Sequence, residues 1–383
     1  MKRIAFVSGM TSVPWGGSEE LWCNTAGRLL ESGNSVWASV VRWPEVPASV
    51  RQLENHGAVV NRRNWKAAPL AIRMWGKLRR QPVVHPGYTS SWPQLCRFRP
   101  DVACISHGFI NCGLDWMLRC LDAGIRYVSI IHANGEFYWP DDEQARLMIK
   151  AHLGAERSYF VSRANLLLFQ KQIGQELPNA EVIRNPFHVS WNARPSWPSL
   201  DSGFRLACVG RLVPSSKGQD LLFEVLAKEK WRNRPLSVSL FGDGACAEGV
   251  RRLVSMYGLE HRVRFAGHVD NPEEIWEQHH ALILPSRLEG LPISIVEAML
   301  CGRLAIVTNI AGNTELIDDD VTGFVAAAPT VEHLDEAMER AWRRKSEWEQ
   351  MGAAAAVSIR EQVPHDPAAV LSQKLLALAE GTV

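Results

Sequence analysis

The sequence predicts an α/β protein built from two domains, each with a largely parallel sheet. Three observations point to this fold class. The chain has 383 residues, enough for two domains of ordinary size. Short β-rich apolar runs alternate with helical patterns along most of the length, as expected for parallel α/β layers. The alternation breaks between Ser190 and Gly203, where proline, serine and glycine accumulate without periodicity, and this break predicts a domain boundary.

Each half is expected to open with a strand, a loop and a helix. In the first half Ile4 to Val7 is the strand, residues 9–17 form the loop, and Ser18 caps a helix that ends near Gly33. Further strands are expected at 36–41, 102–105, 127–131, 159–161, 181–183, 204–209, 236–241, 263–265, 281–284 and 304–307. We therefore predict an N-terminal domain over 1–190, a linker over 191–203, a C-terminal domain over 204–360, and a final helix within 361–383 that packs back on the N-terminal domain.

Composition excludes several classes of protein. With 46% apolar and 22% charged residues, the chain is ordinary for a soluble globular protein. It has no apolar run long enough to span a membrane, and its first apolar run is too short for a signal peptide. The eight cysteines form no CxxC pair, so we expect no zinc site and a reducing, cytoplasmic location. The net charge of +1 gives no general reason to expect nucleic acid as a partner.

The near-zero charge hides an asymmetry between the two halves. Residues 1–196 carry 23 basic and 15 acidic residues, whereas residues 197–383 carry 19 and 26. Between Asn55 and Pro100 there are nine basic residues and no acidic one. If residues 69–80 are helical, the apolar face that includes Trp75 opposes a basic face formed by Arg73, Lys77 and Arg80. Such a helix is a candidate for contact with an anionic membrane surface or a lipid-linked acceptor, although an ordinary surface helix fits equally well.

The segment from Leu282 to Gly302 carries the most informative motif. A strand runs into a tight turn that contains Glu289, and a helix follows that contains Glu297. In an open parallel sheet, ligands bind at this edge. The backbone amides that could face an anion at the helix start belong to Gly290, Leu291 and Ile293. The two carboxylates could then accept hydrogen bonds from sugar or ribose hydroxyls. The alternative is that Glu289 only caps the helix and Glu297 is a solvated surface residue.

Two other loops have the composition of anion sites. After the strand that ends at Gly210, Arg211 and Lys217 flank a short loop, and two cations there can neutralise a diphosphate. Near the N-terminus, Gly16 and Gly17 open the first helix and allow close backbone approach to a phosphate or sugar. A solvated basic pair and a plain turn are the alternative interpretations. The glycine spacing fits neither a Walker A loop nor a dinucleotide fingerprint.

Histidine and tryptophan add weaker signals to the first half. His132 directly follows a predicted strand, where it could orient a hydroxyl or relay a proton, or simply serve as a structural hydrogen-bonding group. Ten of the fifteen tryptophans precede residue 196. They could supply platforms for sugar stacking, although burial in the core is the commoner role of tryptophan.

Taken together, these segments resemble the retaining, nucleotide-sugar-dependent glycosyltransferases of family 4. The motifs that carry the resemblance are Gly-Gly-Ser-Glu near the start, Gly-Arg-Leu…Lys-Gly after residue 204, Gly-Asp-Gly, Phe-x-Gly, Glu-x7-Glu followed by Ala-Met, and Glu315-Leu-Ile…Thr322-Gly-Phe324. Their order and spacing match from about residue 204 to 330, whereas the first half matches only in short pieces. The resemblance implies a GT-B fold of two facing Rossmann-like domains with a cleft between them.

The resemblance also implies roles for individual residues. Arg211 and Lys217 would hold the donor diphosphate, Glu297 the nucleotide ribose, and Glu289 the donor sugar. His268 and Val269 would contact the base through main chain, Gly17 would approach the diphosphate, and His132 would lie near the donor sugar. Arg303 stands where the family usually has proline, which leaves the local loop geometry open.

The expected activity is transfer of a sugar, with retention, from a nucleotide diphosphate sugar to a carbohydrate or lipid-linked acceptor. No cofactor and no metal are expected, because Arg211, Lys217 and helix N-termini could stabilise the leaving diphosphate, and Asp318-Asp319-Asp320 lies in a late surface turn. We expect no nucleic acid partner and a cytoplasmic location, with a peripheral position at the inner face of the membrane as a candidate. A sugar-nucleotide epimerase, a glycogen-type phosphorylase and a non-catalytic sugar-nucleotide-binding protein are the competing interpretations.

Overall fold

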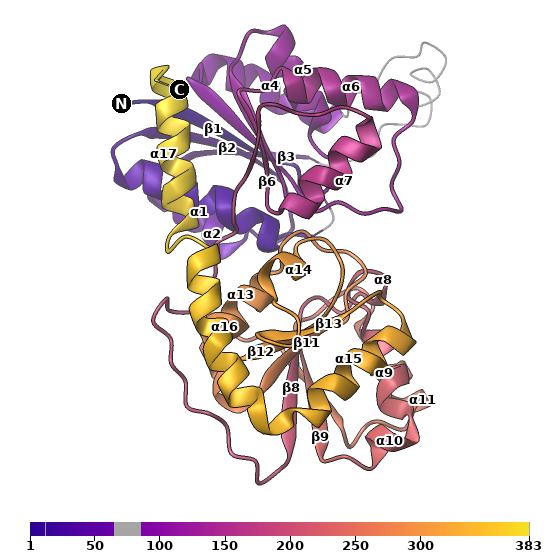
Figure 1. The fold of residues 1–383 in the computed structure, drawn as a ribbon. Coiled ribbons are helices and arrows are strands. Elements are labelled where there is room, and N and C mark those ends of the chain that lie inside the picture. Colours follow the sequence, from indigo (N-terminus) through magenta and orange to yellow (C-terminus); the bar gives the residue numbers. More distant parts are fainter. Residues whose placement is uncertain (12, 65–85, 383) are drawn as a thin grey trace. The chain divides into compact units, whose positions relative to one another are not determined.

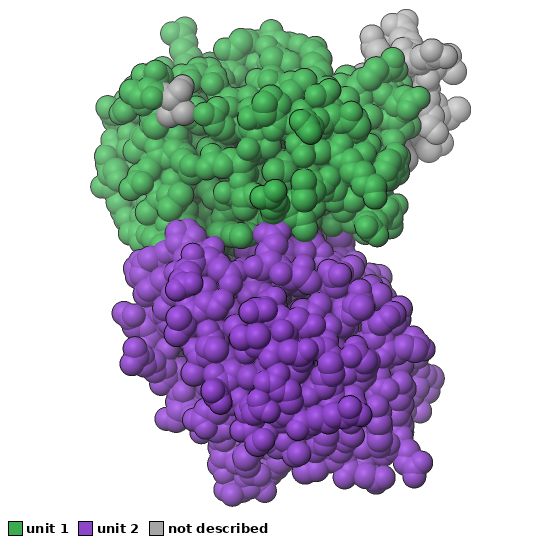
Figure 2. All heavy atoms as spheres, viewed as in Figure 1, with its two compact units in different colours: residues 1–186, 366–383 green, residues 187–365 purple. Residues whose placement is uncertain are grey.

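The protein is seen in a computed structural model that describes residues 1–11, 13–64 and 86–382 (Figure 1). The chain separates into two compact units (Figure 2). Unit 1 comprises Met1–Pro186 with Asp366–Val383, and unit 2 comprises Phe187–His365. Each unit has its own sheet and its own hydrophobic core.

Unit 1 contains a seven-stranded sheet in the order β3-β2-β1-β4-β5-β6-β7, with every neighbouring pair parallel. Its strands are β1 (Arg3–Ser8), β2 (Ser35–Val41), β3 (Val59–Arg63), β4 (Val102–His107), β5 (Tyr127–Ile131), β6 (Arg157–Phe160) and β7 (Ala180–Val182). The inner strands are buried throughout, as expected for a parallel sheet covered by helices on both faces.

The helices of unit 1 that the structure describes are α1 (Gly17–Glu31), α2 (Ala48–Asn55), α4 (Pro86–Phe98), α5 (Leu114–Asp122), α6 (Asp142–Leu153), α7 (Arg163–Ile173) and α17 (Pro367–Glu380). The last of these belongs to the end of the chain and lies beside α1 (Figure 1). Leu371 and Leu375 of α17 are fully buried in the core around β1 and β4. An ion pair of 2.7 Å between Arg28 and Asp366 adds a surface tie.

Unit 2 contains a six-stranded sheet in the order β10-β9-β8-β11-β12-β13, again all parallel. Its strands are β8 (Phe204–Val209), β9 (Leu236–Phe241), β10 (Val263–Gly267), β11 (Ala281–Leu284), β12 (Leu304–Thr308) and β13 (Gly323–Ala326). Its helices are α8 (Pro214–Lys217), α9 (Gln219–Ala227), α10 (Glu229–Arg232), α11 (Ala247–Met256), α12 (Glu273–Gln278), α13 (Ile293–Leu300), α14 (Asn313–Leu316), α15 (Val331–Arg343), the short 3₁₀ helix η1 (Lys345–Glu347) and α16 (Trp348–Gln362).

Each sheet has a point at which the direction of winding reverses. In unit 1 the reversal lies between β1 and β4, and in unit 2 it lies between β8 and β11. The loops after two such neighbouring strands diverge to opposite faces of the sheet and leave a crevice between them, which is where open α/β sheets bind ligands. The chain order therefore marks one candidate ligand position in each unit.

The segment 191–203 that the sequence predicts as a linker is packed onto unit 2, which begins at Phe187. We call this segment the strap. The buried Arg303 donates a hydrogen bond of 2.7 Å to the carbonyl of Ser196, and its guanidinium lies 5.0 Å from the ring centre of Trp197. Arg360 donates to the carbonyl of Trp191 at 2.7 Å. The proline and serine residues here belong to an extended segment that arginines hold in place. Composition alone does not distinguish such a segment from a free linker.

The first helix begins earlier than expected. Gly16, not Ser18, is the residue that precedes α1, and its backbone is extended with a φ of −170°. Ser18 lies in the first turn, so its hydroxyl does not cap the helix. Over the described ranges of the chain, no helix is long and apolar enough to cross a membrane.

Candidate functional site

The crevice of unit 2 brings together the two loops that follow β8 and β11. These strands are neighbours, with Ala281 opposite Leu206 in the register. The backbone amides of Arg287 and Leu288 donate to the carbonyl of Ser216 at 2.8 and 3.1 Å. The loops are thus joined through main chain as well as through the side chains described below.

An ion pair between Lys217 and Glu289 lies at the centre of this crevice. The Lys217 Nζ is 2.5 Å from the Glu289 Oε1, and the two side chains are only 16% and 7% exposed. The hydroxyl of the fully buried Ser286 donates to the same oxygen at 2.6 Å. The second carboxylate oxygen, Oε2, accepts no hydrogen bond from the residues that the structure describes. One oxygen of Glu289 is therefore fixed and the other remains able to accept a hydrogen bond from a ligand.

A glycine allows the two loops to approach so closely. Helix α8 ends at Gly218, which has a φ of +65°, and a Cβ atom there would lie 1.9 Å from the carbonyl oxygen of Pro285. A side chain at this position would force the loops apart. The close approach brings Lys217, one residue earlier, within reach of Glu289.

A second ion pair fixes the same loops from outside the crevice. Arg287 forms two hydrogen bonds with Asp220, at 2.6 and 2.7 Å, and a third with the carbonyl of Pro214 at 2.9 Å. Our sequence interpretation gave no role to Arg287, Asp220 or Ser286. The only sequence signal is the polar Ser286-Arg287 pair, which follows a fully apolar strand after one proline.

Arg211 presents its side chain to solvent at the same edge. The guanidinium is exposed and makes no hydrogen bond or ion pair with the described residues, while the Arg211 carbonyl accepts from Gln219 at 2.8 Å. The turn after β9 supports this loop, because a Cβ on Gly242 would lie 2.4 Å from the carbonyl oxygen of Gly210. A fixed backbone with a free guanidinium suits recognition of an anion.

Glu297 is buried, not solvated. Its side chain is 4% exposed, and its Oε1 accepts a hydrogen bond of 2.9 Å from the amide of His188. The residue before α13 is Pro292, and no side chain caps the helix. The alternative in which Glu289 caps the helix and Glu297 is a surface residue is therefore wrong. Gly290, Leu291 and Ile293 lie at the start of α13, where helix amides have no partner within the helix.

His268 and Val269 follow β10 at the edge of the sheet, separated from β8 by β9. The side chain of His268 is 83% exposed, and its Nε2 lies 3.6 Å from Asp270. Neither residue touches the Lys217–Glu289 pair, and their contact with a base remains a prediction.

In unit 1, Gly16 and Gly17 lie at the start of α1 beside the crevice between β1 and β4. Gly17 is exposed, and the amide of Glu19 donates to the carbonyl of Gly16 at 2.8 Å. The missed residue here is Glu19, which is 3% exposed. Burial raises the pKa of Glu19 to about 7, and the nearby Arg63 opposes that rise only in part. Arg63 itself is 1% exposed and donates to the carbonyl of Ser39, so this member of the basic run between residues 55 and 100 is buried.

His132 is a buried, neutral histidine at the end of β5. Its Nδ1 lies 3.1 Å from the Oδ1 of Asn185, and its Nε2 lies 3.1 Å from the hydroxyl of Ser106. Burial lowers the pKa of His132 to about 4, against the opposing effect of the hydrogen bond to Asn185. Because an amide oxygen only accepts, the proton resides on Nδ1.

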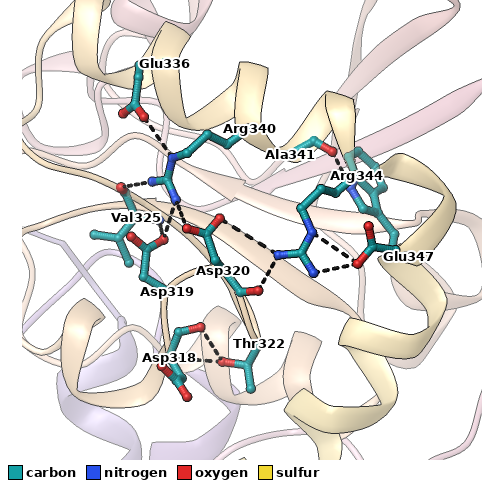
Figure 3. Close-up of polar contacts among 11 residues, drawn as sticks. Asp318, Asp319, Asp320, Thr322, Val325, Glu336, Arg340, Ala341, Arg344 and Glu347 are labelled. Atoms are coloured by element: carbon teal, nitrogen blue, oxygen red, sulfur yellow. Dashed lines mark hydrogen bonds and ion pairs between the residues drawn. The ribbon is translucent and has the colours of Figure 1, made fainter.

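The acidic triplet Asp318-Asp319-Asp320 forms ion pairs with arginines (Figure 3). Arg340 binds both Asp319 and Asp320, at 3.0 and 2.8 Å, and Arg344 also approaches Asp320. Two carboxylates of this turn therefore serve to attach it to α15. Among the described residues, no group of three or more His, Cys, Asp or Glu side chains could hold a metal ion. The membrane candidates Arg73, Trp75, Lys77 and Arg80 lie outside the described residues.

The two doubly wound parallel sheets, with the strand orders given above, define a GT-B fold of two Rossmann-like domains. Solved structures agree with this assignment. The Anabaena protein Alr3699/HepE, solved in complex with UDP and with UDP-glucose, matches 100% of both chains with TM-scores of 0.75 and 0.74 at 18% and 19% identity.

Residues 189–357, nearly all of unit 2, match the model of the family described as glycosyl transferases group 1. The alpha-D-kanosaminyltransferase of Streptomyces kanamyceticus is 30% identical over 135 residues, which cover 34% of each chain. A GDP-mannose-dependent alpha-(1-6)-phosphatidylinositol monomannoside mannosyltransferase of Mycobacterium tuberculosis is 31% identical over 160 residues, which cover 39% of this chain and 41% of the relative. The chain thus spans well under half the length of these relatives.

Proposed function

We propose that the protein is a glycosyltransferase that moves a sugar from a nucleotide diphosphate sugar to a saccharide or lipid-linked acceptor, with retention. The observation that carries this proposal is the arrangement in unit 2. The Lys217–Glu289 pair, the free guanidinium of Arg211 and the start of α13 all lie at the crevice where open sheets bind nucleotides.

The reaction needs stabilisation of the diphosphate as the bond to the sugar breaks. Lys217 supplies a compact charge and Arg211 a fork of donors, and both act on negative charge that develops in the transition state. The free Oε2 of Glu289 is available to a sugar hydroxyl. These groups supply leaving-group stabilisation without a metal, and metal-independent transfer is part of the proposal.

The remaining residues position the donor. Glu297 offers a carboxylate to the ribose, with one oxygen already oriented by the amide of His188. We assign His132 a positioning role and not proton relay, because both ring nitrogens have partners and the low pKa keeps the ring neutral near pH 7. The main chain of His268 and Val269 would contact the base.

The relatives support two choices for the donor base and one kind of lipid-linked acceptor. One similar structure was solved with UDP-glucose, and one relative is GDP-mannose-dependent and acts on a phosphatidylinositol monomannoside. A lipid-linked acceptor would place the enzyme at a membrane surface, and the eight free thiols support work in a reducing compartment such as the cytoplasm.

The test is a panel of UDP-, GDP- and ADP-sugars incubated with the purified protein, with and without saccharide acceptors. If the protein transfers the sugar, it should release a nucleoside diphosphate, and this release should increase with the right acceptor. The product should keep the anomeric configuration of the donor. A new sugar nucleotide without release would instead show epimerisation. Binding without either product would show a non-catalytic protein, and both results would overturn the proposal.

A further inference from the structure

Exposed aromatic side chains gather at the ends of β4 and β5 in unit 1. Phe137 and Trp139 are 74% and 60% exposed, in the loop that leads from β5 to α6. Phe137 stacks on Phe109, which follows β4, with ring centres 5.7 Å apart and an interplanar angle of 14°. Tyr138 meets Phe109 edge-on at 5.6 Å. We call these four residues the aromatic platform.

The loop that carries the platform is held by buried amides. Asn134 and Gln172 are 2% and 3% exposed and share a hydrogen bond of 2.8 Å. Gln172 also donates to the carbonyls of Gly135 and Tyr138 at 3.0 and 2.7 Å. Burial of an amide is costly unless it is hydrogen-bonded, and here the bonds fix a loop whose aromatic rings face water. Folding does not require these rings to be exposed. A binding surface, in contrast, loses less conformational entropy on binding when its aromatic side chains are already held in place.

Phe109 and Tyr138 connect the platform to the core beneath. Both are partly buried against the cluster that includes Ile131 and Phe169. The exposed rings of Phe137 and Trp139 therefore rest on a packed base. Six other tryptophans have a structural role, since Trp22, Trp37, Trp116, Trp231, Trp276 and Trp348 are among the largest fully buried side chains. Among the tryptophans that the structure describes, only Trp139 belongs to the exposed large apolar residues.

The charge around the platform selects the kind of ligand. Residues 133–145 include four acidic residues, Glu136, Asp141, Asp142 and Glu143, and no basic one. All four are exposed. An anionic membrane would be repelled by these carboxylates, whereas sugar hydroxyls can donate hydrogen bonds to them. The platform also lies at the carboxyl edge of the sheet, as His132 does.

We propose that the aromatic platform binds the apolar face of a sugar ring in an uncharged saccharide acceptor, with Phe137 and Trp139 as the contact residues. That the bound saccharide is the acceptor rests on the proposed function, whereas the saccharide site itself does not. Binding of this kind would give unit 1 the acceptor side of the reaction and leave the donor to unit 2.

The experiment measures saccharide binding directly, by saturation-transfer NMR with the methyl glycosides of glucose, mannose, galactose and N-acetylglucosamine. The wild-type protein is compared with the double variant Phe137→Ala, Trp139→Ala. Both positions are exposed, so the variant should fold normally. Met256→Ala is the control, because Met256 is 67% exposed on α11 of unit 2. We expect the signal of at least one glycoside to fall five-fold or more in the double variant and to be unchanged in the control.

Two results would overturn this proposal. One is the absence of any glycoside signal in the wild type, or equal signals in the wild type and double variant. The other is flotation with phosphatidylcholine–phosphatidylglycerol vesicles that the double variant alone loses, which would make the surface a membrane contact. Nucleoside diphosphate release without acceptor is measured in parallel. Glycoside binding through the platform without release from any donor would leave the platform standing and remove the proposed transfer.

Discussion

Lys217 and Glu289 form a buried ion pair whose surroundings suit catalysis better than stability. Taking two charges out of water is costly, and such pairs often contribute little net stability. Here Ser286 adds a hydrogen bond to the oxygen that Lys217 already holds, so the carboxylate is fixed in one orientation. A charge held in advance where new charge will develop is the usual source of electrostatic catalysis.

Replacing Lys217 should therefore reduce turnover more than donor binding. We expect Lys217→Ala to lower kcat by roughly 10²–10³-fold, because the leaving diphosphate loses its nearest ammonium group. Steady-state kinetics with the donor found in the panel would measure the effect. Lys228→Ala is the matched control, since Lys228 is also paired with a carboxylate, Asp335, at 2.8 Å. A kcat for Lys217→Ala close to that of the wild type would remove the assignment.

Buried histidines should make unit 1 sensitive to acid. Burial lowers the pKa of His152 to about 3, so the folded state keeps this ring neutral while the unfolded state protonates it near 6.5. Its stabilisation is thus complete above pH 6.5 and is lost as the pH falls below it, by about 2 kcal/mol at pH 5. Urea titrations at pH 7 and pH 5 should show a smaller loss for His152→Gln than for the wild type, with the exposed His56→Gln as control. An equal loss in His152→Gln would contradict this.

At the scale of single residues, the sequence predicts the charged groups better than their partners. Lys217 and Glu289 could be proposed because each follows a strand at the same sheet edge, and the structure joins them. Asp220 and Arg287 could not, because their role exists only through a contact across 67 residues of chain. Glu19 was missed for a similar reason, since its burial depends on how α1 packs against the sheet.

At the scale of elements, the alternation of apolar runs was enough to place most strands, because buried parallel strands are short and continuous in apolar character. The ends of elements were harder to predict. The first helix begins at Gly17 without a side-chain cap, and the strap has the composition of a linker although arginines attach it to unit 2.

Arg303 should control whether the strap stays attached. Its guanidinium donates to carbonyls of Trp276, His279 and Ser196, which a shorter or uncharged side chain cannot replace. We expect Arg303→Met to lower the free energy of unfolding of unit 2 by about 2–4 kcal/mol, since several buried carbonyls lose their donor. Hydrogen exchange at the amide of Ala193 in the strap, which donates to the carbonyl of Ser190 at 3.0 Å, should become much faster.

The control for that variant is Arg343→Met, because the Arg343 side chain is 75% exposed and its ion pair with Glu339 has a distance of 3.5 Å. Exposed pairs contribute about 0–1 kcal/mol, so this change should leave both measurements nearly unaffected. Unchanged exchange of the strap in Arg303→Met would show that other contacts hold it.

At the scale of the whole molecule, the proposed function and the proposed saccharide site assign different roles to the two units. Unit 2 carries the family match and the charged crevice, and unit 1 carries His132 and the aromatic platform. This division explains why sequence motifs predict the proposed donor side in detail and the proposed acceptor side hardly at all, since the aromatic platform has no motif beyond its composition.

The proposed metal independence depends on all cations of the crevice together. We expect turnover to be unchanged when divalent ions are removed with a chelator, since Arg211 and Lys217 supply the positive charge. The check is the initial rate of nucleoside diphosphate release before and after chelation. Loss of the rate, with recovery on adding Mg²⁺ or Mn²⁺, would assign leaving-group stabilisation to a metal.

We expect the crevice between β8 and β11 to bind a nucleoside diphosphate through Arg211 and Lys217. The most direct test is calorimetric titration of UDP, GDP and ADP into the wild type and into the variant Arg211→Ala, Lys217→Ala, with hydrogen exchange recorded in both states. One nucleotide should bind the wild type, protect residues 210–219 and 286–297, and bind the variant at least ten-fold more weakly. Equal affinity for the two proteins, or protection confined to other segments, would contradict it.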